Sequence, residues 1–494
     1  MRNRIVLLAA AVGVIGVACT SSGYEFDGLV PTSSTVADSD GVAPGGVAPG
    51  EGVVVAPAER ASARNQVGYV FPPAPPVDTG PANPALVADI EALIRGLDVS
   101  FNFETLTRIG GSGDPRAAWL LSDILRFVGR GEVETALVDA FEELTGASLE
   151  DDPVLGRSSW QSMTDHLIAW DIPALGGYPS WKSQLFTRVE PKWQAFFDDR
   201  DALIDWRLVS WGGVLIDDRP LGTATGCVRG CIPALDDPAV TDAGGGNWYP
   251  DDRIVFGVTV NGESRAYPKN IMEVHEMVND TLGGRRLGIP YCTLCGSAQA
   301  YLTDEVPDGV AEPILRTSGL LSRSNKVMYD LVTFSVLDTF TGEALSGPLL
   351  DAGVTLSQTS VVTSTWGEWR IAHPDTTIVA RDGGIGRSYD LDPLGGRDDD
   401  GPIFPIGDVD DRLPVQAKVL GVIYEGTAIA FDVEAAVATI AAGGAVVWND
   451  IELVADGSGV RAMRTDGTPV AAHEAFWFAW SQFHPDTLVW TTSP

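Results

Sequence analysis

Two cysteines, Cys292 and Cys295 in PYCTLCG, are the residues whose types and spacing most directly suggest chemistry. A histidine, His275, precedes them in VHEMVND. Two sulfurs and one imidazole form a soft ligand set, which suits Cu(I) or Zn(II) better than Mg²⁺ or Ca²⁺. Cys292, Cys295 and His275 are therefore candidate ligands of copper or zinc.

The C-x-x-C spacing supports two other hypotheses. Such a pair can be redox-active, and Cys292 would then attack a disulfide as a thiolate while Cys295 acts as the resolving thiol. It can also be an inert disulfide that closes a short loop in an exported protein. The residues alone leave all three interpretations open.

A second pair, Cys227 and Cys231 in GCVRGCIPALDDP, has C-x-x-x-C spacing with glycine and proline around it. This pattern favours a disulfide that staples a loop. The number of cysteines also permits a four-cysteine zinc site with Cys292 and Cys295, but the long interval between the pairs makes that reading unspecific.

The elements around the C-x-x-C motif must bring its ligands together. We expect a helix over 271–280, ended by Gly283-Gly284, and a strand over 286–291 that runs back beside it. A strand of that length rises roughly 20 Å. It would therefore return Cys292 to about the level at which His275 projects from the helix.

The pattern W-x-x-W-x-x-x-H-P-D-T occurs twice, at 366–376 and at 477–487. The tryptophans and the histidine have helical spacing, and the proline that follows must end the helix. His373 and His484 would then lie in the last turn, near free carbonyl groups. No nucleophile or acid recurs with both copies, so we interpret the pattern as a joint between a helix and a strand.

Two predicted hairpins also resemble each other, VFGVTVNGESRAYP at 255–268 and VLGVIYEGTAIAFD at 419–432. Asn-Gly between alternating apolar runs is a strong hairpin signal. Together with the repeated helix–strand joint, they indicate an internal duplication. We divide this region into a first half, 211–400, which carries the C-x-x-C motif, and a shortened second half, 401–494.

A helical module is expected over 87–210, where apolar residues recur at helical spacing. Asp114-Pro115 is a suitable helix start. His166 lies among apolar residues and is expected to be a buried histidine with its hydrogen bonds satisfied. The module carries no recognisable chemistry, so we interpret it as a packing or docking module through which a protein partner could bind.

The first 19 residues have the pattern of an export signal, with Arg2 and Arg4 before a short apolar stretch. Small residues before Cys19 resemble a bacterial lipobox, which would make Cys19 the lipidated N-terminus, although an ordinary cleaved signal has similar features. Residues 20–86 are rich in Gly, Pro, Ser and Ala and are expected to form a disordered tether. The protein would then be anchored on the outer face of the membrane or in the cell envelope.

The chain has 494 residues and a formal net charge of −34. The length predicts two or three domains. The acidic charge argues against a nucleic-acid partner, because phosphates attract basic surfaces.

Several of these motifs, taken in order, resemble the DUF3179 family of exported bacterial and archaeal proteins. They include CIPALDDPAV, VHEMVND, PYCTLCGSAQAY, TSGLLSRSNKVMYD, GEALSGPL and LPVQAKVLGV, over roughly 225–435. The family motif is of the Cys-Pro-Leu-Cys-Gly type, and Thr293 replaces its proline here. The chain departs further at Val336-Leu337-Asp338, where the family more often has a Trp-Ser-Gln-like run. If that run lines the site, the ligand contacts here will differ from those of the family.

The sequence therefore predicts an α+β protein, with an N-terminal helical module followed by a β-rich α+β domain. The leading functional hypothesis is binding of a soft metal in the cell envelope, with Ser318, Asn325 and Tyr329 in the same pocket. The alternatives are a thiol–disulfide oxidoreductase and a disulfide-stabilised scaffold, so the sequence leaves enzymatic activity undecided.

Overall fold

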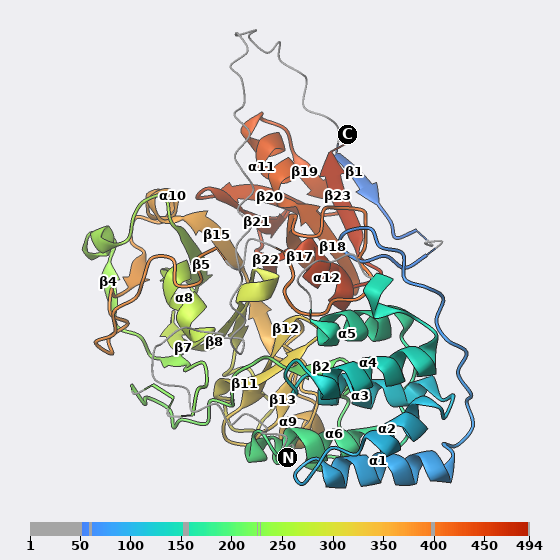
Figure 1. Ribbon diagram of the computed structural model, residues 1–494. Coiled ribbons are helices and arrows are strands. Elements are labelled where there is room, and N and C mark those ends of the chain that lie inside the picture. Colours follow the sequence, from blue (N-terminus) through green and yellow to red (C-terminus); the bar gives the residue numbers. More distant parts are fainter. Residues whose placement is uncertain are drawn as a thin grey trace, which may run out of the picture.

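The computed structural model describes residues 52–58, 62–151, 158–224, 226–227, 229–396 and 401–492. The predicted export signal and Cys19 lie outside these residues. The α+β class is confirmed. The helices α1 to α6 are gathered on one side of the molecule, and several sheets with further helices among them make up the rest (Figure 1). None of the helices in the described ranges is long and apolar enough to cross a membrane.

The first helix of the helical module begins at Pro84, slightly before the predicted start at residue 87. Asn83 caps its first helix by accepting a hydrogen bond from the Ala85 backbone N–H, and Ser158 and Gln161 form a capping box at the fifth. The helices are α1 (Pro84–Gly96), α2 (Phe103–Gly110), α3 (Ala118–Leu125), α4 (Glu132–Thr145), α5 (Ser159–Trp170), α6 (Tyr178–Phe186) and α7 (Gln194–Asp198). His166 is buried as expected, with its ring nitrogens beside Ser162 O and the Tyr69 hydroxyl.

The helical module shares its hydrophobic core with a four-stranded sheet. The strand order is β13-β12-β11-β2, with β2 at Val209–Trp211, β11 at Leu315–Ser322, β12 at Asn325–Asp330 and β13 at Val336–Leu337. Leu320, Tyr329 and Val336 of this sheet belong to the same buried cluster as Trp119, Phe186 and other residues of the helices. The module therefore packs against the β-rich part of the chain.

Two five-stranded sheets have the same topology. In strand order they are β15-β5-β6-β16-β4 and β22-β17-β18-β23-β1. In each, the central hairpin and both outer contacts are antiparallel, and one internal pair is parallel. The first sheet comprises β4 (Val240–Asp242), β5 (Ile254–Val260), β6 (Glu263–Pro268), β15 (Val361–Thr365) and β16 (Thr377–Val379). The second comprises β1 (Gly52–Val55), β17 (Lys418–Tyr424), β18 (Thr427–Asp432), β22 (Ala472–Phe476) and β23 (Leu488–Thr492).

The repeated W-x-x-W-x-x-x-H-P-D-T pattern forms the same joint in both sheets. It builds α10 (Trp366–Ala372) before β16 and α12 (Trp477–Phe483) before β23. The second tryptophan of each copy donates a hydrogen bond to the threonine that ends the pattern, over 3.0 Å from Trp369 to Thr376 and 2.9 Å from Trp480 to Thr487. The joint is thus architectural, as expected, and the duplication itself remains a prediction that these shared features support.

A further sheet, β14-β10-β8-β7-β3, carries the C-x-x-C motif at one end of β8. Its strands are β3 (Leu235–Asp236), β7 (Met277–Leu282), β8 (Arg285–Cys292), β10 (Ala300–Leu302) and β14 (Ser357–Thr359), and β9 (Ser297–Ala298) pairs with β8 off this path. The other elements are α8 (Lys269–His275), α9 (Gly347–Asp351), α11 (Val433–Ala441), β19 (Val446–Trp448), β20 (Ile451–Asp456) and β21 (Gly459–Arg464).

The expected helix over 271–280 is wrong in its second half. Helix α8 ends at His275, because Glu276 adopts a left-handed backbone with φ of 51°. The next residues form β7, which pairs with β8 in antiparallel fashion. The strand preference of Val278 and its neighbours in a two-stranded ladder outweighs the short-range helical spacing.

The expected tether over 20–86 is wrong from residue 52 onward. Residues 52–55 add strand β1 to the edge of the second sheet, and Phe71 is buried at 4% exposure. The Arg64 backbone N–H also donates to the Asp408 carboxylate, and the Arg64 carbonyl accepts from the Val409 N–H. A short valine run and a few aromatic residues suffice to dock a segment whose overall composition is that of a linker.

Candidate functional site

The C-x-x-C motif occupies the turn between β8 and β9. Cys292 ends β8, and Thr293–Cys295 form a single 3₁₀ turn. Gly296 then reverses the chain with φ of 58°, and a Cβ there would lie 2.9 Å from the Phe476 ring. The left-handed backbone and the close aromatic ring both require glycine at this position.

Both cysteines are free thiols and are almost completely buried, at 2% and 0% exposure. The turn between β11 and β12 covers them. The Cys292 sulfur lies 3.7 Å from the Ser324 carbonyl oxygen, and the Cys295 sulfur lies 3.7 Å from the Ser324 hydroxyl oxygen. The structure thus brings the two predicted sulfurs together against one residue.

The two thiols differ in acidity. Burial raises the pKa of both groups. For Cys292 this is outweighed by interactions with the neighbouring Cys295 and with the backbone N–H and ammonium group of Lys326, so its pKa is lowered. For Cys295, burial and the neighbouring Cys292 sulfur raise the pKa well above the usual value. Cys292 is therefore the more acidic of the two thiols.

A buried acid–base pair, Glu276 and Lys326, lies beside the thiols. The Lys326 ammonium group is 3.6 Å from the Glu276 carboxylate and also donates to the Glu276 backbone carbonyl. Thr293, inside the C-x-x-C motif, donates a hydrogen bond to Glu276 over 3.4 Å. Burial raises the pKa of the Glu276 carboxyl, against the opposing effect of Lys326. Glu276 is thus a buried carboxyl, held against the C-x-x-C turn through Thr293, that is protonated more readily than an exposed one.

His275 does not join the thiols, so the predicted three-ligand set is wrong in its third member. Strand β8 does return to the expected level, since the Tyr291 N–H donates to Glu276 O. However, the His275 ring points to the other side, with Nδ1 2.6 Å from Pro233 O and Nε2 2.7 Å from the Tyr389 hydroxyl. Because the chain turns sharply at Glu276, that side chain faces the thiols in place of His275.

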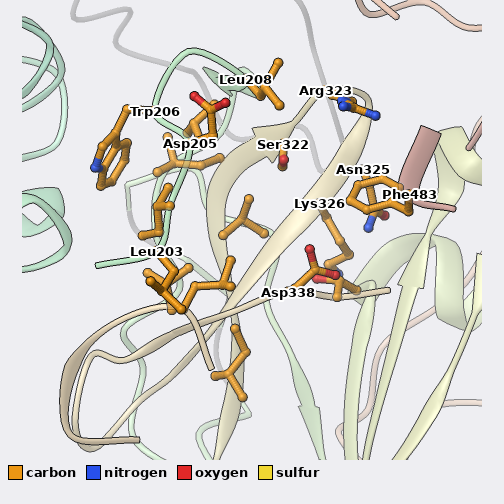
Figure 2. Close-up of a pocket in the computed structure, with 18 of the residues that line it drawn as sticks. Leu203, Asp205, Trp206, Leu208, Ser322, Arg323, Asn325, Lys326, Asp338 and Phe483 are labelled. Carbon is orange, nitrogen blue, oxygen red and sulfur yellow. The ribbon is translucent and has the colours of Figure 1, made fainter. Parts of the chain in front are cut away.

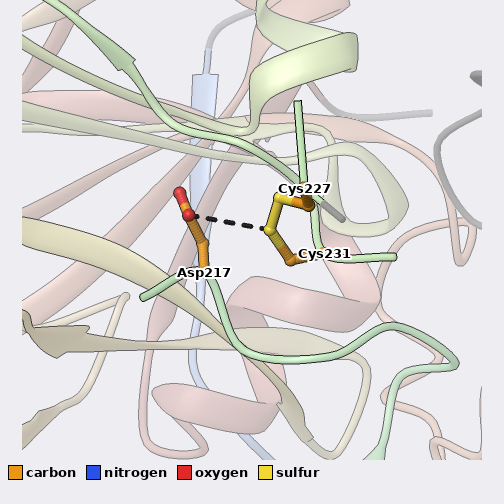
Figure 3. A group of neighbouring side chains, drawn as sticks. All are labelled: Asp217, Cys227 and Cys231. Atoms are coloured by element: carbon orange, nitrogen blue, oxygen red, sulfur yellow. Dashed lines mark hydrogen bonds between the residues drawn. A yellow bond between two sulfur atoms is a disulfide. The ribbon is translucent and has the colours of Figure 1, made fainter. Parts of the chain in front are cut away.

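Cys227 and Cys231 form the predicted disulfide. Figure 3 shows it next to Asp217, whose carboxylate lies 3.6 Å from the Cys231 sulfur. Among the described residues, Asp217, Cys227 and Cys231 are the one group of three or more acidic, cysteine or histidine side chains close enough to share an ion. Both sulfurs are bonded to each other in the disulfide, and the Asp217 carboxylate forms an ion pair with Arg219 over 2.7 Å. These three side chains are therefore already engaged with other groups.

A cavity of about 260 Å³ adjoins the turn that covers the thiols. Of the three predicted pocket residues, Asn325 lines it, beside Lys326 and Asp338 (Figure 2). Ser318 and Tyr329 do not, because their hydroxyl groups donate to the carbonyls of Val327 and Asp217 inside the core. Val336, Leu337 and Asp338 also line the cavity, at the position where the sequence departs from the motif it resembles.

Residues 229–466 match the family model described as "Protein of unknown function (DUF3179)". The chain is a DUF3179 domain-containing protein. Neither the curated proteins nor the solved structures contain a match to it. The matched range covers all the residues of the thiol site, whereas the helical module lies outside it.

Sequence reasoning missed Glu276 and Lys326 in the DUF3179 domain. Both stand inside motifs that carried the resemblance, VHEMVND and SRSNKVMYD. The signal that could have identified them is a charged residue inside an otherwise apolar stretch, because such residues are rarely buried without a partner. Their contact depends on a turn and a hairpin that are far apart in the sequence.

Proposed function

We propose that this DUF3179 domain is a thiol–disulfide oxidoreductase with Cys292 as the nucleophile and Cys295 as the resolving thiol. One observation carries the proposal: the two sulfurs are free, lie against the same residue, Ser324, and differ in acidity, with the pKa of Cys292 lowered and that of Cys295 raised. An inert structural disulfide needs no such asymmetry, and a thiolate is the reactive form in disulfide exchange.

The reaction transfers two electrons from the thiol pair to a disulfide. The Cys292 thiolate attacks one sulfur of the substrate, which breaks the substrate S–S bond and releases one thiolate that solvent protonates. Cys295 then gives its proton to the Glu276 carboxylate and attacks the Cys292 sulfur of the mixed disulfide. The second substrate thiolate leaves, Cys292 and Cys295 are oxidised to a disulfide, and the substrate is reduced to two thiols.

Access to Cys292 requires the turn around Ser324 to move, because both sulfurs are buried behind it. The neighbours of Ser324 on each side, Arg323 and Asn325, line the cavity. Arg323 also has a left-handed backbone, with φ of 54°. We propose that the substrate approaches from this side.

An exported location fits this chemistry. The Cys227–Cys231 disulfide is typical of an oxidising compartment, and the basic and apolar residues before Cys19 have the pattern of an export signal. We propose that Cys19 anchors the protein to the membrane and that the domain acts in the cell envelope.

Metal binding at the same sulfurs is the second candidate. Two adjacent soft sulfurs in a buried apolar site favour Cu(I), with zinc as the alternative. In this case Cys292 and Cys295 would be the ligands, without His275.

Trapping the mixed disulfide tests the proposal. Purified wild-type, Cys292→Ser and Cys295→Ser proteins are incubated with glutathione disulfide, quenched with acid, alkylated after unfolding and weighed by mass spectrometry. We expect the wild type to form the Cys292–Cys295 disulfide without accumulating the mixed disulfide, and Cys295→Ser to retain glutathione on Cys292. The Cys292→Ser variant serves as the matched control and should retain none on Cys295.

Metal content measured on the same samples separates the two candidates. Stoichiometric copper or zinc that disappears in Cys292→Ser, with no mixed disulfide in Cys295→Ser, would replace the redox proposal by metal binding. A thiol pair that neither forms a disulfide nor traps glutathione would overturn the redox proposal.

A further inference from the structure

The cavity beside Ser324 contains polar atoms that have no partner. In the described part of the chain, Asn325 Oδ1, Thr339 Oγ1 and Gln482 Oε1 are buried and make no hydrogen bond. All three residues line this cavity, and Asn325 and Thr339 are only 1% and 2% exposed. Because leaving a buried polar atom without a partner is unfavourable, such atoms gathered in one cavity indicate a ligand that satisfies them.

The unsatisfied atoms are oxygens, which can accept hydrogen bonds from a ligand that carries donors. The Gln482 amide is fixed in orientation, because its nitrogen donates to the Ile406 carbonyl and leaves the oxygen as an acceptor. Asp338 adds a partly buried carboxylate, which accepts hydrogen bonds from the backbone N–H groups of Phe340 and Thr341. No ion pair within the described residues involves Asp338, although the Arg323 guanidinium lies close enough to interact with its charge.

The cationic residues of the cavity already have partners. Lys326 is held by the Glu276 carboxylate and backbone carbonyl. Arg323 donates to the Gln482 backbone carbonyl and lies over the Phe483 ring, 5.9 Å from its centre. A second carboxylate of the cavity, Asp205, is paired with Arg207 over 2.6 Å. The groups left for a ligand are therefore the unsatisfied acceptors and the Asp338 carboxylate, which together favour a cation.

Much of the remaining wall is apolar or aromatic. Leu203 and Trp206 lie opposite Asn325, Lys326 and Asp338 (Figure 2). Leu203 is 61% exposed and marks the side that opens to solvent. At about 260 Å³ the cavity is slightly smaller than the range of about 300–1,000 Å³ that is usual for drug-sized ligands, so it fits a small molecule.

We propose that this cavity binds a small amphipathic amine, with the ammonium group at Asp338, Thr339 and Gln482 and an aromatic or aliphatic body against Trp206 and Leu203. The ammonium group supplies the donors that the unsatisfied oxygens lack. The net charge of −34 raises the local concentration of cations around the protein.

Calorimetric titration of the full-length protein with three matched probes tests this inference. Phenethylamine, phenethyl alcohol and hydrocinnamate share a phenyl body and carry a cationic, a neutral and an anionic head. We expect phenethylamine to bind at least about tenfold more tightly than the alcohol, as one charge-assisted hydrogen bond allows, and hydrocinnamate to bind most weakly. Tightest binding of hydrocinnamate would assign the cavity to anions through Arg323 and Lys326, and absence of binding by any probe would overturn the proposal.

Two variants locate the head group. Asp338→Asn keeps the shape of the side chain and should reduce the affinity for phenethylamine at least about tenfold, with little change for the alcohol. Asp382→Asn removes an exposed carboxylate outside the cavity and should leave both affinities unchanged. An equal loss of amine affinity in both variants would show that only the overall negative charge matters, and would overturn the site. None of the probes contains a disulfide, so the outcome is independent of the proposed thiol chemistry.

Discussion

The ammonium group of Lys326 lies 3.6 Å from the Glu276 carboxylate, and the two side chains are only 4% and 9% exposed. Removing one partner of a buried pair leaves an uncompensated charge, which typically costs about 3–5 kcal/mol. We therefore expect Lys326→Met to lower the free energy of unfolding by that amount and to raise the pKa of Glu276 further. Urea denaturation of the wild type and the variant measures the loss.

A double variant separates loss of the pair from loss of packing. Glu276→Gln combined with Lys326→Met removes both charges and should recover a large part of the stability. Arg95→Met breaks an exposed pair with Glu91 and should change the free energy of unfolding by less than about 0.5 kcal/mol. If the double variant is as unstable as Lys326→Met, the charge of Glu276 is not the cause.

In both copies of the helix–strand joint, the second tryptophan packs against a glycine of the neighbouring hairpin. A Cβ at Gly421 would lie 2.0 Å from the Trp480 ring, and a Cβ at Gly257 would lie 2.3 Å from the Trp369 ring. Both rings are buried in the core, so Gly421→Ala and Gly257→Ala should each destabilise the fold by about 1–3 kcal/mol through overpacking. Thermal unfolding of each variant tests the effect. Gly176→Ala is the matched control, because nothing lies within 4 Å of its added Cβ; a similar loss there would contradict the packing explanation.

The sequence predicted those parts of the fold that depend on local patterns. The helical module, the two hairpins and the helix–strand joints have short periodicities or turn residues that determine them. The Cys227–Cys231 disulfide also followed from spacing, because only three residues separate its members.

The candidate site was predicted only in part, because its composition depends on one backbone angle. The left-handed conformation of Glu276 ends α8 early and directs His275 toward Pro233 and Tyr389. The sequence correctly predicted that Cys292 lies beside the end of α8. It could not show whether the side chain of His275 or that of Glu276 would point toward Cys292. Similarly, the docking of residues 52–55 on β23 is a contact between the two ends of the described chain, which composition alone does not reveal.

Glu474 on β22 should make stability depend on pH near neutrality. Burial raises its pKa from 4.5 to about 7, against the opposing effect of Lys418. The contribution of Glu474 to the free energy of unfolding is fully present below pH 4.5. It is lost as the pH rises to about 7, because this carboxyl group ionises at a lower pH in the unfolded chain than in the folded protein. As the pH rises between these values, we expect the free energy of unfolding of Glu474→Gln to increase relative to that of the wild type by up to about 3 kcal/mol. Urea denaturation across this range tests the slope, and a difference between the two proteins that does not change with pH would refute it.

His473, next to Glu474 in the chain, should have the opposite dependence. Burial lowers its pKa from 6.5 to about 3, and the nearby His484 has a pKa lowered to about 4 for the same reason. Protonation therefore favours the unfolded state, so the contribution of His473 is complete above pH 6.5 and is lost as the pH falls toward 3. We expect His473→Gln to lose less stability than the wild type on acidification, by a few kcal/mol at most. The Glu474 and His473 effects overlap between pH 4.5 and 6.5, so each variant is compared with the wild type at every pH. Imidazole resonances of His473 that titrate near pH 6.5 in the folded protein would show that the ring is not held neutral.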